Sequence, residues 1–303
     1  MADADLRPMT LGEVLDRTFN LYKNHFWLFA GITALPFSLL LIAEVAVAAA
    51  GSLTANSPAA QAPALSPGAL GGVIGGGALV MILYFLMIGG AHAATVFAVS
   101  DLYLSRPVSI RGSLSRVGWK VFRVLLLFFL IGLIIGVGVL IAAVFGVMIG
   151  QPAFIFLGML LLFVPAIILV CRTAVAIPAA MLEDLGAVRA LERSVYLTKG
   201  HVMQIFVIFL LVVVATYVAI LVLQMPLLIL MMASAAAHKT PSFGLQLLQQ
   251  LAAFVSQVLV GPIGTIAFSL MYYNLRVRKE AFDIQHLMAS MSSNPEPNAP
   301  SAA

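Results

Sequence analysis

Long apolar runs alternate with short polar and basic stretches along the chain, and this alternation predicts a membrane protein made of helices. A helix needs about 20 mainly apolar residues to span a bilayer. Six runs reach that length, at 26–50, 70–99, 121–149, 153–182, 202–232 and 245–273. The pattern therefore predicts an all-α, polytopic membrane helical bundle with about six transmembrane helices in three hairpins.

Prolines within the apolar runs and polar loops between them add detail to the predicted spans. Proline removes a backbone donor, so each proline within a run is an expected kink. These prolines are Pro36, Pro165, Pro178, Pro226 and Pro262. The uncharged stretch 51–66 is expected to be a flexible loop, and 150–152 a tight turn.

The polar stretch before each hairpin has a helical period of its own. Apolar residues line one face and charged residues the other in 11–24, 109–122 and 187–199. In the last of these, the apolar stripe consists of Val188, Leu191, Val195 and Tyr196. Basic amphipathic helices of this kind lie in the headgroup plane with their apolar face toward the acyl chains. We therefore expect an interfacial amphipathic helix before each hairpin.

Two of these stretches share a motif. Asp16, Arg17 and Thr18 align with Glu192, Arg193 and Ser194 at a constant shift of 176 positions. Self-similarity of this kind is typical of internal repeats. The middle stretch lacks the triplet and fits by pattern only, and any six-span chain alternates polar and apolar segments without duplication.

The proposed units divide the chain. We predict repeat-like units at 10–106, 107–184 and 185–280 within one membrane domain at 10–284. A short tail, 1–9, precedes this domain. The tail at 285–303 is rich in Ser, Asn, Pro and Ala, so it is expected to be disordered.

Composition and charge support the membrane assignment. The chain is 62% hydrophobic and 9% charged, whereas soluble domains carry roughly 25% charged residues. All Lys and Arg residues except Arg172 and Lys239 fall on one side of the predicted spans. The positive-inside rule then predicts cytoplasmic termini and explains the net charge of +4 without a nucleic-acid partner. The N-terminal residues do not resemble a signal peptide.

Ionisable residues within spans are the first candidates for function. Glu44 lies about 27 Å along its helix from Phe26, near the interface opposite the basic residues. Arg172 is expected nearer mid-depth, where it could reach headgroups, pair with an acid or hold an anionic ligand. His92 follows two glycines and is expected to bond across helices.

Catalytic patterns are missing from the sequence. It has no HExxH, GxSxG or P-loop motif, and no Cys or His cluster with metal-ligand spacing. The glycine-rich run 71–77 predicts close helix packing instead of phosphate binding. Glu183 and Asp184 would point about 100° apart on a helix, so a capping or Arg-pairing role is favoured for Asp184. We predict no enzyme, no catalytic residue, no cofactor and no metal.

A second set of residues is expected to hold the amphipathic helices against the ends of the spans. The candidates for this structural interface are Asp16, Arg17, Glu192, Arg193, Asp184, Asn274 and Arg276. Arg17 and Arg193 are expected to matter most.

Three motifs resemble a known family. They are RPMTLGEVLDRTFNLYKNHF near the start, PAAMLEDLGAVRALERSVYLTKG at 178–200 and MYYNLRVRKEAFD at 271–283. Together they resemble the bacterial multi-span membrane proteins named for the glycerophosphoryl diester phosphodiesterase membrane domain, over about 8–284. The resemblance implies a six-span protein of the bacterial plasma (inner) membrane. It implies no phosphodiesterase activity, because the segment after Asp283 is too short for the catalytic domain that follows in some relatives. The family usually has Asp where Asn274 stands.

The sequence is compatible with three functions. The first is a non-enzymatic scaffold, assembly or regulatory protein, whose basic helices contact anionic lipid headgroups and whose partner is a membrane protein or a second copy. The second is a transporter or permease for a small or lipid-related anionic solute, with Arg172 and His92 along its path. The third is a membrane accessory to glycerophosphodiester or lipid metabolism.

Overall fold

The protein is described by a computed structural model over residues 8–55, 67–149, 152–236 and 242–280. Six long helices in these ranges are apolar enough to cross a membrane. They are α2 (Phe26–Ala55), α3 (Pro67–Tyr103), α5 (Val121–Ile149), α6 (Pro152–Thr173), α9 (Val202–Ala236) and α10 (Phe243–Glu280). The described residues contain no strand. The prediction of an all-α, multi-pass membrane protein is confirmed.

Short helices gather at one end of the long ones. They are α1 (Leu11–Asn24), α4 (Ile110–Ser115), the 3-10 helix η2 (Gly118–Lys120), α7 (Ala176–Leu182) and α8 (Ala187–Thr198). Because the described Lys and Arg residues also collect on these helices and the adjoining helix ends, we call this the basic end. The opposite ends of the long helices are the far end.

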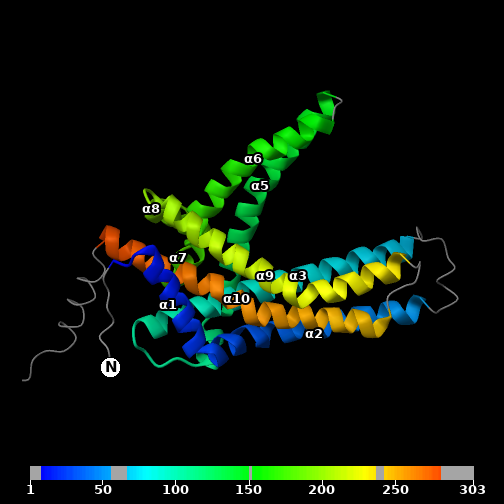
Figure 1. Ribbon diagram of the computed structural model, residues 1–303, viewed down its shortest axis with the longest axis horizontal. Helices are drawn as coiled ribbons and strands as arrows, with labels where there is room; N and C mark the ends of the chain where they lie inside the picture. The colour runs from blue at the N-terminus through cyan, green and yellow to red at the C-terminus, as the bar shows by residue number, and fades with distance from the viewer. Residues whose placement is uncertain (1–7, 56–66, 150–151, 237–241, 281–303) are drawn as a thin grey trace, which may run out of the picture.

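The long helices form two groups that diverge from the basic end. Helices α2, α3, α9 and α10 lie side by side, whereas the hairpin of α5 and α6 leaves them at a wide angle (Figure 1). The best-packed core lies where the groups meet, and Phe29, Leu127, Met181, Leu197 and Tyr272 are fully buried there. Away from this junction, α5 and α6 expose most of their large apolar side chains.

Local sequence explains where the short helices begin and end. The Thr10 side chain accepts from the Glu13 backbone N–H, while the Glu13 carboxylate accepts from the Thr10 N–H, and this capping box starts α1. The Ser109 side chain accepts from the Gly112 N–H at the start of α4. Gly200 has a φ of +89°, which lets the chain turn sharply between α8 and α9.

The predicted fourth span is broken, which differs from the single run expected at 153–182. Helix α6 ends at Thr173, and α7 begins at Ala176. Pro178 lies in the first turn of α7, where its missing N–H has no helical acceptor to lose, so it starts a helix instead of kinking one. The Arg172 carbonyl at the break accepts hydrogen bonds from the Ser194 and Thr198 hydroxyls of α8.

The amphipathic helices lie against protein more than expected. Helix α8 buries Ala187, Ala190, Ser194, Leu197 and Thr198. The buried face of α8 is not the predicted apolar stripe, because Val188, Val195 and Tyr196 of that stripe are exposed. Four of the five buried residues are small, and the buried face packs on α6 and α7. The middle helix is shorter than predicted, since it divides into α4 and η2 around Gly118, which has a φ of +40°.

The prolines, the glycine-rich run and the first loop differ in how they fit the predicted spans. Pro36, Pro165, Pro226 and Pro262 lie inside helices that continue past them. A Cβ atom at Gly75, Gly76 or Gly77 would meet no described atom within 4 Å, so the prediction of close packing there was wrong. Helix α2 extends to Ala55, five residues into the expected loop. The rest of that loop, the turn at 150–151 and the tail at 285–303 lie outside the described residues.

Candidate functional site

An ionic cluster centred on Arg193 joins three helices at the basic end. From α8, Arg193 donates through Nε to Glu183 Oε1 and Oε2 at 3.0 and 2.9 Å. Its Nη2 donates to Glu280 Oε2 of α10 at 2.8 Å. The Glu280 carboxylate, together with Glu183, raises the pKa of the guanidinium above its usual value. Arg193 is therefore held as a permanent cation between the end of α7 and the end of α10.

Helix α10 completes the cluster. Arg276 Nε lies 3.2 Å from Glu280 Oε2, one helical turn away. Tyr272 donates to Glu183 Oε1 at 2.7 Å, and Arg276 Nη1 donates to Tyr272 Oη at 3.4 Å. Both acids and both arginines are about one-fifth exposed. The paired charges make the arrangement suited to joining helices, since neither carboxylate is left unpaired to act as a base.

Arg17 occupies the corresponding place in α1 but has different contacts. Its guanidinium lies over the Tyr103 ring at 4.7 Å, and Tyr103 stacks on Tyr273 of α10. Arg17 Nη1 also approaches Met9 Sδ at 3.8 Å. Arg17 thus contacts α3 through a cation–π interaction where Arg193 uses carboxylates.

The backbone at Met9 is attached to α10 by Asn274. The Met9 N–H donates to Asn274 Oδ1 at 2.8 Å, and Asn274 Nδ2 donates to the Met9 carbonyl at 3.1 Å. Arg278 Nη2 donates to the same carbonyl at 2.8 Å. Asn274 is buried, and its amide satisfies both polar groups of one residue 265 positions away.

Asp184 pairs with cations, which is one of the two roles expected for it. Its Oδ1 lies 3.0 Å from Lys120 Nζ and 2.5 Å from Arg123 Nη1. Hydrogen bonds from these cations hold the pKa of the carboxyl below its usual value. Asp184 does not cap α8, whose N-cap Gly186 makes no side-chain cap bond.

A second ion pair joins Arg116 to the buried Asp101 at 2.8 Å and fixes the loop after α3.

The acids of the repeated triplets take no part in these contacts. Asp16 and Glu192 are exposed, and neither has an ion pair with a described residue. Their Ser/Thr neighbours are buried: Thr18 bonds to the Val14 carbonyl in its own helix, and Ser194 bonds to the Arg172 carbonyl. The residues that complete the cluster, Glu183, Glu280 and Tyr272, were not predicted. The four-residue spacing of Arg276 and Glu280 was the signal for part of it.

Arg172 was expected nearer the middle of its span, and the structure places it at the end of α6. Because α6 ends at Thr173, Arg172 lies in the last turn of its helix at the basic end. Its side chain is exposed and has no ion pair with any described residue. This position lets the guanidinium extend to the headgroup region.

His92 lies inside the four-helix group, and Glu44 lies toward the far end. His92 Nδ1 shares a hydrogen bond with Thr265 Oγ1 of α10, so its contact does cross between helices. The ring also lines a cavity of about 230 Å³ between α3, α9 and α10. Glu44 is half-buried and lines a smaller cavity of about 90 Å³. His92 and Glu44 face separate cavities, and Arg172 is far along the chain from both, at the basic end.

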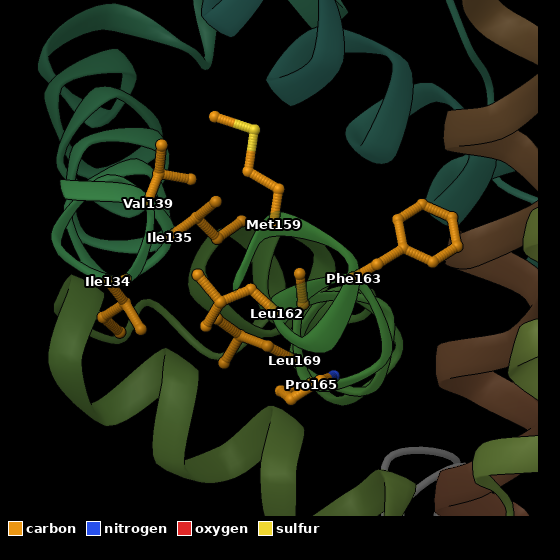
Figure 2. Close-up of a pocket in the computed structure, with 10 residues that line it drawn as sticks. Ile134, Ile135, Val139, Met159, Leu162, Phe163, Pro165 and Leu169 are labelled. Carbon is orange, nitrogen blue, oxygen red and sulfur yellow. The ribbon is translucent and has the colours of Figure 1, made fainter. Parts of the chain in front are cut away.

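A larger groove on the α5–α6 hairpin carries no polar chemistry. Its volume is about 540 Å³, and Ile135, Val139, Met159 and Leu162 point into it (Figure 2). Nearby, a Cβ on Gly158 would lie 2.9 Å from Ala142 Cβ, so the two helices touch closely there. An apolar groove among exposed apolar side chains is suited to lipid chains. No group of three His, Cys, Asp or Glu residues able to hold a metal occurs among the described residues.

The chain matches a known family model over about half of its length. The model of the family described as a domain of unknown function, DUF7847, matches residues 113–275 of the 303-residue chain. The chain belongs to this family. The DUF7847 match starts in α4 and ends in α10, so it contains Glu183, Arg193 and Asn274 but not Arg17, Glu44 or His92. No curated protein and no solved structure matches the chain.

Proposed function

We propose that the protein is a non-enzymatic scaffold, assembly or regulatory protein that holds anionic lipid headgroups at its basic end. The observation that carries this proposal is a division among the cations there. Arg116, Arg193 and Arg276 are paired with acids. A second set is exposed and has no ion pair with a described residue: Lys23, Arg111, Arg172, Arg189 and Lys199. Each exposed cation near an anionic membrane surface contributes about 1 kcal/mol of attraction.

Two tryptophans support placing the membrane boundary at this level. Trp27 and Trp119 are 83% and 84% exposed, at the start of α2 and directly before α5. Tryptophan concentrates at membrane interfaces, where its ring is apolar and its N–H can bond to water or headgroups. The exposed cations and the two rings would then meet the same layer of headgroups.

The proposal includes an orientation and a membrane. The positive-inside rule favours a cytoplasmic basic end and cytoplasmic termini. The three motifs that resemble the glycerophosphoryl diester phosphodiesterase membrane domain proteins favour the bacterial inner membrane. They also support an accessory role in lipid metabolism as an alternative. A reporter fused after Ala303 should be cytoplasmic, and a reporter signal from the opposite side would contradict this orientation.

A membrane-protein partner or a second copy would complete the scaffold. A stoichiometric partner in purified material would support this part.

Lipid preference can be measured with the two native tryptophans. The protein is reconstituted in vesicles in which either phosphatidylglycerol or phosphatidylcholine carries brominated chains, which quench nearby indoles. We expect stronger quenching by brominated phosphatidylglycerol, and we expect Arg111→Gln, Arg189→Gln and Lys199→Gln together to remove the difference. Lys279→Gln is the matched control, because Lys279 Nζ already donates to the Tyr196 carbonyl at 2.6 Å. Equal quenching by the two lipids in the unaltered protein would contradict the proposal.

The cavity beside His92 favours transport as a second candidate. However, no cationic side chain lines that cavity, which weakens the case for an anionic solute. Flux of solutes into proteoliposomes tests the candidate, with His92→Ala and Arg172→Ala measured alongside. Reproducible flux that either substitution abolishes would favour a transporter function over the scaffold function.

A further inference from the structure

A row of polar and small residues follows one face of α10 through the four-helix group. Gln249, Ala253, Gln257, Gly261 and Thr265 recur at four-residue spacing along this row, and Gln250 and Ser256 lie beside it. Such residues are uncommon in a span because the hydrocarbon region offers no water for their polar groups. Their side chains therefore need partners inside the protein.

These side chains surround the cavity next to His92. Its lining combines His92 of α3 with Thr216 and Gln224 of α9 and with Ser256 and Gln257 of α10. Gln257 also lines the two neighbouring cavities, one beside Thr33 and one beside Glu44. The main cavity of about 230 Å³ has room for about seven waters at the volume of liquid water.

Several polar groups at this site have no partner among the described residues. The Gln257 amide, the Thr216 hydroxyl and His92 Nε2 make no hydrogen bond with any of them. The buried Gln249 Oε1 and Gln250 Oε1 atoms, toward the far end, are also unsatisfied. The three unpaired groups line the cavity from α3, α9 and α10, so an occupant that donates and accepts hydrogen bonds would satisfy them.

The cavity extends toward the far end and not toward the basic end. His92 lies about 14 Å along α3 from Asp101, whereas Gln224 lies about 33 Å along α9 from Val202. Between His92 and the basic end, Ala93, Val96, Ile266 and Leu270 are fully buried. The lining therefore runs from His92 toward the far end, and we call this cavity the vestibule.

We propose that this vestibule binds a small, uncharged, hydrogen-bonding solute that comes from the far end. Its lining offers amide, hydroxyl and imidazole groups, which both donate and accept, and it contains no Lys, Arg, Asp or Glu. An anion or a cation would lose its hydration shell there without gaining an opposite charge. Polyols and small amides match the lining because each of their groups can replace a hydrogen bond to water.

Accessibility to a thiol reagent tests whether the vestibule is open to water. In a Cys171→Ala background, which removes the chain's one cysteine, the reporter is Thr216→Cys. The matched control is Val218→Cys, two residues along α9 at a side chain that is 54% exposed on the outside of the bundle. We expect a membrane-impermeant methanethiosulfonate, applied at the far end, to label Thr216→Cys at least tenfold faster than Val218→Cys. Equal rates would overturn the proposal.

Protection of the reporter tests which solutes bind. Glycerol or urea should slow labelling of Thr216→Cys at least threefold, whereas glycerol 3-phosphate and tetramethylammonium should not. Adding Gln257→Leu should abolish this protection while leaving the melting temperature of the protein unchanged. Labelling that neither uncharged probe slows, or that a charged probe slows instead, would overturn the proposal. Ser256→Cys serves as a second reporter if Thr216→Cys does not fold.

Discussion

Arg193 Nη1 lies 2.5 Å from Glu280 Oε1, although the two residues are 87 positions apart. The same guanidinium contacts Glu183, so one side chain connects α8 to the last residues of α7 and of α10. A planar guanidinium can satisfy two carboxylates at once, which a lysine ammonium does with less directional fit. The contact therefore fixes how the third amphipathic helix lies on the bundle.

Arg193→Ala should destabilise the protein substantially. Removing the guanidinium leaves two partly buried carboxylates close together without their cation, at a cost of about 2 kcal/mol. The free energy of unfolding in detergent, measured by denaturant titration, gives the value. Arg189→Ala is the control, because Arg189 is exposed on the same helix and has no ion pair with a described residue. Equal losses in the two variants would show that the cluster does not stabilise the fold.

Asn274→Ala should be more damaging than Asn274→Asp. Alanine leaves the buried Met9 N–H without an acceptor, at about 1–3 kcal/mol. Aspartate keeps that acceptor, and Arg278 still donates to the Met9 carbonyl. Arg278 Nε, at 3.4 Å from Asn274 Oδ1, would also pair with the new carboxylate. Melting temperatures of the two variants, measured side by side, check the order, and the reverse order would exclude this account of the Met9 contact.

Asp184→Asn should remove an acid-dependent part of the stability. Because Lys120 and Arg123 lower the pKa of Asp184 in the folded state, the folded protein binds this proton less readily than the unfolded chain. The stabilisation is complete above the unfolded value of about 3.9 and is lost as the pH falls through the lowered pKa. The difference in melting temperature between the unaltered protein and Asp184→Asn should therefore close on acidification.

The choice of asparagine isolates the charge in this experiment. Asp184 has a φ of +55°, and asparagine adopts this left-handed conformation at least as readily as aspartate. The group is well exposed, so added salt should also reduce the difference at neutral pH. A difference that stays constant from pH 7 to pH 3 would mean that the ion pairs contribute nothing.

Gly158→Ala should loosen the α5–α6 hairpin. The new methyl group would lie 2.9 Å from Ala142 Cβ, so the helices must move apart, at a cost of about 1–3 kcal/mol. Gly136→Ala is the control on the partner helix, since a Cβ there meets nothing within 4 Å. That variant should be neutral or more stable, because alanine favours helix over glycine by up to about 1 kcal/mol. Thermal unfolding in detergent compares the two, and destabilisation by Gly136→Ala alone would contradict the observed packing.

The spans could be predicted from sequence because each is a local, continuous signal. The break between Thr173 and Ala176 was not predicted, because Arg172 and Thr173 are two polar residues within a run that is apolar on both sides of them. What permits the break is the pair of α8 hydroxyls, Ser194 and Thr198, that satisfy the Arg172 carbonyl. Hydropathy records which residues avoid water and does not record which distant hydroxyl replaces a helical hydrogen bond.

The partners of the candidate site residues could not be predicted from the sequence either. The aligned triplets indicated Arg17 and Arg193, yet the acids beside them, Asp16 and Glu192, are exposed without ion pairs among the described residues. Side chains next to each other on a helix point in different directions, so the neighbouring acid cannot reach the cation's partner face. Glu183 and Glu280 take that place because α7 and α10 end beside α8.

The sequence by itself determined that this is an all-α membrane protein, where its six spans lie and which side of them is basic. Those properties depend on hydrophobicity and charge along a helix, and both are local. The tertiary structure alone decided which cations are paired and which are exposed at the basic end. It also decided that His92, Thr216 and Gln257 surround one cavity. These outcomes depend on how helices from distant parts of the chain pack together, since packing sets which polar groups meet.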